Sequence, residues 1–184
     1  MLSCTVDEHI KLELPLIHHA EEIAAVVRAN LERLQLWMPG ACADYSVESA
    51  REFIRRNLKS LAEAGSFGLI IRYDEKFAGT IGFHDLDLVN RSAHIGYWVA
   101  KEFEGRGIIT RCCQSLIDHL FTEMKLNRVQ INCNVENVRS RAVPERLGFK
   151  LEGFHRQVEC IQGKFRDWAI YAMLAEEWPQ STKR

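Results

Sequence analysis

Apolar residues recur at helical spacing in three stretches of the chain. The first runs from Ala20 to Leu34 and should end before residues 37–40 (WMPG), because proline and glycine break helices. A second helix is expected after Ser46, whose side chain suits a helix N-terminus. The strongest pattern places apolar residues at i, i+3, i+4, i+7 and i+8: Ile109, Cys112, Cys113, Leu116, Ile117, Leu120 and Phe121. A further short helix is expected over 138–147, ended by Gly148.

Seven other stretches predict strands, because they alternate polar and apolar residues or are rich in β-branched and aromatic ones. They cover residues 9–14, 67–73, 76–84, 93–99, 128–133, 149–159 and 164–174. Antiparallel hairpins dominate, so we expect a layered α/β sheet with hairpins rather than a doubly wound parallel sheet. No linker divides the sequence, and one domain over residues 1–184 is expected.

Composition narrows the class of protein. The 184 residues are 47% hydrophobic and 27% charged, which suits a globular core. The net charge of -1 argues against a dedicated nucleic-acid binder, because there is no excess of cations to displace counterions. No apolar run approaches a membrane span. The six cysteines form no Cys-x-x-Cys pair and no signal peptide is apparent, so we expect reduced core thiols in a cytoplasmic protein.

The sharpest chemical feature is the loop at 104–107 (EGRG), which leads from an expected strand into the strongest helical pattern. Its glycines let backbone N–H groups turn toward a ligand, and the helix N-terminus adds partial positive charge. The loop therefore suits a phosphate or pyrophosphate, with a tight turn and no ligand as the alternative. A Walker loop would need a lysine, and a dinucleotide fingerprint would need a small residue at Thr110, so ATP and NAD are disfavoured.

The loop resembles the acetyl-CoA loop of the GNAT superfamily of N-acetyltransferases, Gln/Arg-x-x-Gly-x-Gly/Ala, with departures at Glu104 and Ile109. Motifs around it are similar to the RimL/RimJ branch, which acetylates the N-termini of ribosomal proteins. They are WMP at 37–39, IGYWV at 95–99, NVRS at 137–140, ERLGF at 145–149, EGF at 152–154 and GKFRD at 163–167. Their order and spacing argue against chance similarity, although Pro144 is unusual within this pattern.

The resemblance implies the α/β GNAT fold, a single mixed, mostly antiparallel central sheet flanked by helices. It also implies that acetyl-CoA enters a gap where strands 93–99 and 128–133 splay apart. Backbone groups near Trp98 and Val99 would bind the pantetheine arm, as an added strand would. Amides from Gly105 to Thr110 would hold the pyrophosphate. The residues expected to contact acetyl-CoA are Trp98, Val99, Glu104, Gly105, Arg106, Gly107, Ile108, Ile109, Thr110 and Asn137. Arg106 could equally be a solvated loop residue, and Asn137 also suits helix capping.

The same resemblance implies direct attack of a neutral amine on the thioester. Ser140 is the candidate proton donor to the departing thiolate, with a helix N-cap as its alternative role. His94 is the candidate base, because imidazole accepts a proton near neutral pH; its alternative is a strand residue at a polar edge. His84, Asp85 or water could also serve as the base. No metal-ligand spacing appears, so no metal is expected.

We therefore expect an acetyl-CoA-dependent N-acetyltransferase that acts on the N-terminal α-amine of a ribosomal protein. At pH 7 roughly a tenth of an α-amine is neutral, against well under a thousandth of a lysine. The alternatives are a small amine as acceptor (an antibiotic, a polyamine or an amino acid) and a CoA-binding sensor with little turnover. The acceptor pocket is expected from the variable segments 37–46 and 155–166. The apolar strands over 149–174 predict a homodimer, and no nucleic-acid or membrane partner is expected.

Overall fold

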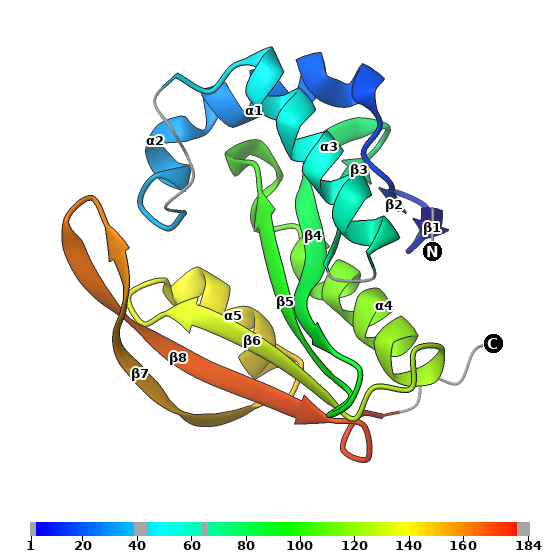
Figure 1. Cartoon of the computed structure of the whole chain (residues 1–184), viewed down its shortest axis with the longest axis vertical. Helices are drawn as coiled ribbons and strands as arrows, with labels where there is room; N and C mark the ends of the chain where they lie inside the picture. Colours follow the sequence, from blue (N-terminus) through cyan, green and yellow to red (C-terminus); the bar gives the residue numbers. More distant parts are fainter. Residues whose placement is uncertain (1–2, 39–43, 64–65, 180–184) are drawn as a thin grey trace.

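The computed structural model describes residues 3–38, 44–63 and 66–179, arranged around one mixed sheet of eight strands (Figure 1). The strands lie in the order β1-β2-β3-β4-β5-β6-β8-β7. Their bounds are β1 Ser3–Thr5, β2 Ile10–Glu13, β3 Phe67–Tyr73, β4 Lys76–Asp87, β5 Ser92–Val99, β6 Arg128–Asn134, β7 Lys150–Ile161 and β8 Lys164–Leu174. Neighbouring strands run antiparallel except for β5 and β6, which confirms the predicted mixed sheet. All seven predicted strands are present, and β1 is an addition that is too short to show an alternating pattern.

The helices match the predicted pattern with one interruption. Their bounds are α1 Ala20–Ala29, α2 Leu31–Leu34, α3 Val47–Ala62, α4 Ile108–Thr122 and α5 Val138–Arg146, with 3-10 turns at Ile17–His19 and Lys101–Phe103. The single helix predicted from Ala20 to Leu34 breaks at Asn30. The Asn30 Oδ1 atom accepts a hydrogen bond of 2.8 Å from the backbone of Lys101, and Nδ2 donates one of 2.9 Å to the Val26 carbonyl. A long-range contact therefore sets this break, which the local spacing does not reveal.

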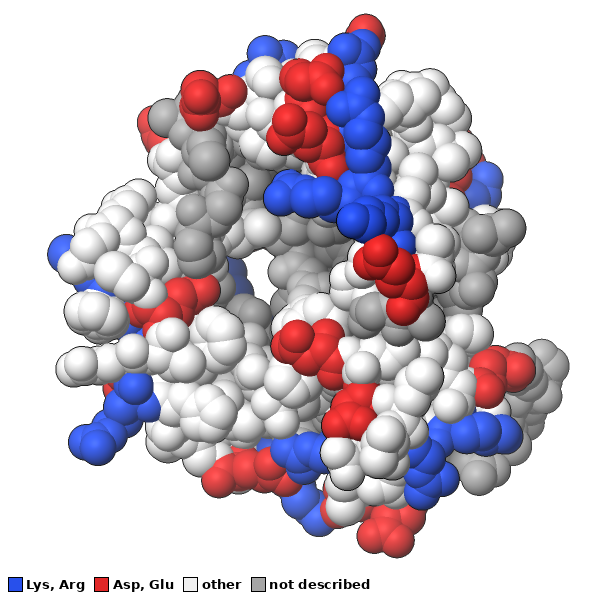
Figure 2. Space-filling model, in the orientation of Figure 1, with Lys and Arg blue, Asp and Glu red and all other residues white. Residues whose placement is uncertain are grey.

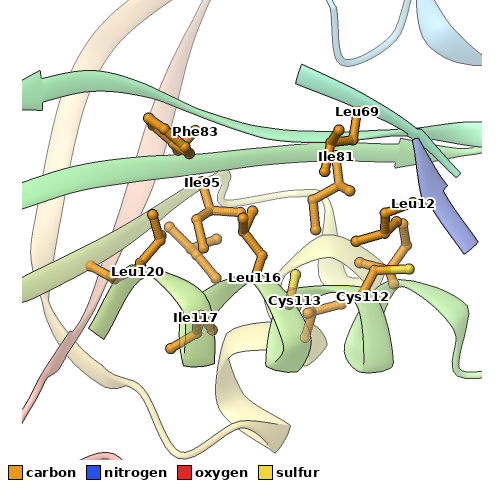
Figure 3. Close-up of a cluster of buried hydrophobic side chains, with 14 of the residues drawn as sticks. Leu12, Leu69, Ile81, Phe83, Ile95, Cys112, Cys113, Leu116, Ile117 and Leu120 are labelled. Carbon is orange, nitrogen blue, oxygen red and sulfur yellow. The ribbon is translucent and has the colours of Figure 1, made fainter. Parts of the chain in front are cut away.

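The sheet buries apolar side chains on both faces. In β3, Leu69 and Ile71 pack with the cluster under α4, whereas Ile70 packs with α1 and α3, because successive strand residues point to opposite faces. Figure 3 shows the α4 side, where Cys112, Cys113, Leu116, Ile117 and Leu120 meet Leu12, Leu69, Ile81, Phe83 and Ile95. Burying one Leu or Ile side chain contributes about 1.5–3 kcal/mol, so this face anchors α4 to the sheet.

The thiols follow the prediction only in part. Cys112, Cys113 and Cys133 are buried, but Cys160 on β7 is exposed because β7 is the last strand of the sheet. The expectation of core thiols is therefore wrong for Cys160, and Cys42 lies outside the described residues. Among the described helices, none is long and apolar enough to cross a membrane.

Candidate active site

The central cavity lies where β5 and β6 separate. The two strands pair in parallel only between Ser92–His94 and Arg128–Gln130, and beyond these residues they part. A cavity of about 500 Å³ fills the opening. Its walls include 95–99 of β5 and 131–134 of β6, and Figure 2 shows the hollow in the middle of the molecule. The predicted splay of these strands is confirmed.

A second cavity, of about 810 Å³, lies at the N-terminus of α4. Gly105 and Gly107 in the loop before the helix have φ angles of 75° and 69°, a left-handed conformation that favours glycine. The first-turn residues 108–110 line this cavity, and first-turn N–H groups have no partner within their own helix. Glu104 and Arg139 line both cavities, so the two adjoin.

Positive charge gathers around the second cavity. Arg111, Arg139 and Arg146 line it, and Arg146 donates a hydrogen bond of 3.0 Å to the Thr110 hydroxyl. The Glu104 carboxylate forms ion pairs with Arg33 and Arg139. Glu104 is the acid that departs from the acetyl-CoA loop pattern, and these two guanidinium groups neutralise it. Two positive charges face one negative charge, so a net positive charge remains beside the loop.

Ser140, Tyr97 and Cys133 form a polar cluster in the first cavity. The Ser140 hydroxyl oxygen lies 3.3 Å from the Cys133 sulfur and 3.5 Å from the Tyr97 hydroxyl, which donates to the Ser140 carbonyl at 2.9 Å. Burial raises the pKa of the Tyr97 hydroxyl well above its usual range, and it also raises the pKa of the Cys133 thiol. Both groups therefore keep their protons at neutral pH, beside the Ser140 hydroxyl.

Comparison with known proteins decides the family. The profile described as acetyltransferase (GNAT) domain matches residues 9–150. This chain belongs to the GNAT acetyltransferases. Over 184 residues it is 44% identical to YdaF of Bacillus subtilis strain 168, whose name provisionally assigns it to the ribosomal N-acetyltransferases. The match covers 97% of this chain and 98% of YdaF.

Two solved GNAT structures are similar over nearly the whole chain. One is RimL, the ribosomal L7/L12 alpha-N-protein acetyltransferase, in complex with coenzyme A, with 27% identity and a TM-score of 0.89 over 94% of this chain and 97% of RimL. The other is the microcin C7 self-immunity acetyltransferase MccE in complex with acetyl-CoA and AMP. It has 29% identity and a TM-score of 0.88 over 92% of this chain and 94% of MccE.

Asn137 and Ser140 take separate positions in this GNAT site. The Asn137 Oδ1 atom accepts a hydrogen bond of 3.1 Å from the Ser140 N–H and so caps α5, while Asn137 also lines the first cavity. Ser140 is the third residue of α5, and its hydroxyl contacts Cys133 and Tyr97 instead. The alternative role of Ser140 as N-cap is therefore wrong.

His94 lies at the apex of the opening, opposite Gln130. It is not among the described residues that line either cavity. Its Nδ1 atom is 3.3 Å from the Asp85 carboxylate, which also contacts His84 at 2.8 Å. Burial, and then the neighbouring His84, lower the pKa of His94. Its role as the base stays a prediction.

Trp98, Val99 and Arg106 were all predicted to contact acetyl-CoA, but they do not all line the cavities. Trp98 and Val99 line the first cavity, but the Val99 carbonyl accepts a hydrogen bond from Arg33. The Arg106 guanidinium lies over the Tyr73 ring, 5.3 Å from its centre. Arg106 is not among the described lining residues of the second cavity, where Arg139 and Arg146 stand.

Sequence reasoning missed Glu159. Its side chain lines the first cavity and accepts a hydrogen bond of 3.0 Å from the Trp168 indole. Glu159 belongs to β7 and reaches the site because β7 pairs with β8. An isolated glutamate in a strand forms no motif; the only available signal was an acid within the expected acceptor segment 155–166. Arg33 also forms no motif, and Arg139 was given no role although it lies within the motif at 137–140.

Proposed function

We propose that this GNAT acetyltransferase transfers the acetyl group of acetyl-CoA to the N-terminal α-amine of a ribosomal protein. The observation that carries the proposal is the pair of adjoining cavities, one between the splayed strands β5 and β6 and one at the N-terminus of α4. The likeness to RimL, which is named for acetylation of L7/L12, supports the choice of acceptor.

The charge around each cavity suits a different part of acetyl-CoA. The pyrophosphate fits at the N-terminus of α4, where backbone N–H groups, Arg139 and Arg146 offer positive charge. The pantetheine arm fits between β5 and β6, whose facing edges are not paired beyond His94 and Gln130. An extended arm can bond to such edges as an added strand does. The thioester would then lie near Ser140.

The reaction moves two protons. The amine nitrogen attacks the carbonyl carbon, the C–S bond breaks, and the amine proton passes to a base. In this proposal Ser140 passes its hydroxyl proton to the departing thiolate while it takes one from water, and the protonated base returns its proton to that water, so the amine proton ends on sulfur. A thiol with a pKa near 8.5 leaves readily as its thiolate, so this relay through a hydroxyl is enough help.

We assign the base to Glu159, with His94 as the alternative that the sequence predicts. Glu159 lines the cavity with a carboxylate held by Trp168, whereas the His94 ring contacts Asp85. Glu159→Gln should lower kcat by about 10²-fold or more, as for other positioned bases. Glu136→Gln is the matched control, because Glu136 lines the same cavity but pairs with Arg166. If His94→Gln lowers kcat and Glu159→Gln does not, the base is His94.

A panel of acceptors tests the function. Peptides that carry ribosomal-protein N-termini, including that of L7/L12, are incubated with acetyl-CoA while CoA release is measured. We expect turnover with a free α-amine, and none with the same peptide blocked at its N-terminus but keeping an internal lysine, since far less of the lysine is neutral. Turnover with small amines alone would contradict the proposed acceptor.

A small amine is the second candidate acceptor. Trp37, Trp98 and Trp168 line the first cavity and offer flat apolar surfaces to a compact ligand. The MccE structure holds AMP together with acetyl-CoA, which supports a small ligand within the same fold. The small-amine arm of the panel decides between the two candidates.

We also propose a homodimer formed through the β7–β8 hairpin. Phe154 and Phe165 on this hairpin are 54% and 66% exposed, and Leu151 and Val158 are exposed as well. Exposed aromatic side chains of this kind are typical anchors of protein interfaces.

A further inference from the structure

Two histidines face each other across the β4–β5 hairpin. His84 of β4 and His94 of β5 are directly opposed in the antiparallel register. Their rings meet edge to face with centres 5.5 Å apart. Opposed residues share one face of a sheet, so both imidazoles lie on the same side.

Asp85 joins the two histidines because the backbone is irregular at this point. In a regular strand Asp85 would point to the face opposite His84. Here Asp85 has a φ of 52°, and the β4–β5 register shifts between His84 and Asp87. Bulges of this kind re-aim side chains. As a result, the Asp85 Oδ2 atom lies 2.8 Å from Nδ1 of His84 and 3.3 Å from Nδ1 of His94.

We propose that His84, Asp85 and His94 bind a divalent transition-metal ion such as Zn²⁺, through two imidazole nitrogens and one carboxylate oxygen. Tetrahedral Zn²⁺ has such ligands at about 2.0–2.1 Å, which places neighbouring donor atoms about 3.3–3.4 Å apart. The three donor atoms lie within 4.8 Å of one another, so small side-chain movements close the site. Two imidazoles favour Zn²⁺, Cu²⁺, Ni²⁺ or Co²⁺ over Mg²⁺ and Ca²⁺, which prefer all-oxygen sites.

The surroundings admit a metal ion. The side chains of His84, Asp85 and His94 are 51%, 69% and 30% exposed, which leaves a fourth position for water. Arg128 is a cationic neighbour of His94. Its guanidinium group donates to both carboxylate oxygens of Glu152, at 2.8 and 2.5 Å, so a carboxylate balances its positive charge. None of the three proposed ligands is among the described residues that line the two cavities, so the proposed ion would lie outside both.

Zn²⁺ titration of the full chain, without a polyhistidine tag, tests the site by calorimetry. We expect one ion per chain, and at least tenfold weaker binding in His84→Gln and in Asp85→Asn. Removing a residue that only hydrogen-bonds to a metal ligand lowers metal affinity about 10- to 100-fold, and removing a ligand should cost at least as much. His155→Gln is the matched control, because His155 lies on β7, away from this hairpin. Circular dichroism confirms that each variant folds.

Co²⁺ absorption distinguishes this site from binding at a thiol. Ligation by imidazole and carboxylate gives d–d bands without a thiolate-to-metal charge-transfer band. The proposal is overturned by absence of one-to-one binding at millimolar Zn²⁺, by a thiolate band, or by equal affinities of His84→Gln and His155→Gln. Because the readout is metal binding, a failure here leaves the proposed acetyl transfer untouched.

Discussion

Asn137, which caps α5, and Ser140, in the first turn of α5, make different contacts. Asn137 holds the N-terminus of the helix, and Ser140 presents its hydroxyl to the cavity beside Cys133 and Tyr97. Either residue could have capped the helix from its type and place in the sequence. The hydrogen bonds assign the cap to Asn137, so the two roles can be tested by separate substitutions.

Ser140→Ala should lower kcat by about 10²-fold or more, because the hydroxyl matters chiefly as charge develops on sulfur. Affinity for acetyl-CoA and the melting temperature should stay nearly unchanged. Asn137→Ala should instead lower the free energy of unfolding by about 1 kcal/mol, the usual cost of a lost cap. Steady-state kinetics and melting curves measure both effects. Wild-type kcat in Ser140→Ala would leave water as the proton donor.

Burial also determines which thiols react. It raises the pKa of Cys112 to about 12 and that of Cys113 well above its usual range. The thiolate is the reactive form, so at pH 8 only about one in 10⁴ Cys112 side chains is reactive. Burial also keeps reagents away from this thiol. Alkylation of the native protein followed by mass spectrometry should modify the exposed Cys160 and spare Cys112 and Cys113. Equal labelling of all three would show that α4 detaches from the sheet.

At the scale of elements, the loop before α4 depends on glycine for its shape. Gly107 has a φ of 69° and immediately precedes the first helical turn. A Cβ atom there would meet none of the described residues within 4 Å, so a larger side chain clashes with none of them. The penalty is instead backbone strain, together with bulk directed toward a bound ligand.

Gly107→Val should therefore weaken CoA binding by tenfold or more, which corresponds to about 1.4 kcal/mol. Gly163→Val is the matched control, since Gly163 has a φ of 74° and open space around its Cβ, but lies in the β7–β8 turn. The control shares the strain and should keep its CoA affinity. Calorimetry with CoA measures both variants. Unchanged affinity in folded Gly107→Val would remove this loop from the cofactor site.

At the scale of the whole molecule, the sheet divides into two parts that meet only at the base of the opening. Figure 1 shows β6, β8 and β7 running away from β5 at an angle. The β7–β8 hairpin contributes Glu159 and Trp168 to the first cavity and also carries the exposed Phe154 and Phe165. A partner on this hairpin would therefore lie close to the acceptor side of the site.

Sedimentation at micromolar concentration should show a homodimer, and Phe165→Glu should shift it toward monomer, because a buried, unpaired charge opposes association. Val89→Glu is the matched control, because Val89 is 92% exposed in the β4–β5 turn. It should leave the oligomeric state unchanged. A monomeric wild-type protein, with and without CoA, would contradict the proposed dimer.

Local pattern in the sequence determined the elements and the family. The spacing of apolar residues predicted α4, because one face of a helix must be buried, and alternation predicted the hairpins. The short loop at 104–110 and the motifs around it indicated acetyl-CoA chemistry, since backbone amides and a helix N-terminus are consecutive along the chain. Each of these signals resides within one stretch of sequence.

Tertiary structure alone decided which distant side chains meet. Glu104 gains its partners Arg33 and Arg139 from α2 and α5, and Glu159 reaches the cavity through the pairing of β7 with β8. His84 and His94 become neighbours only through the β4–β5 register, and Asp85 joins them only because a bulge turns its side chain. The spacing of apolar residues predicts which face of an element is buried. It does not predict which residues lie opposite that face, because strand register and helix placement follow from packing across the whole molecule.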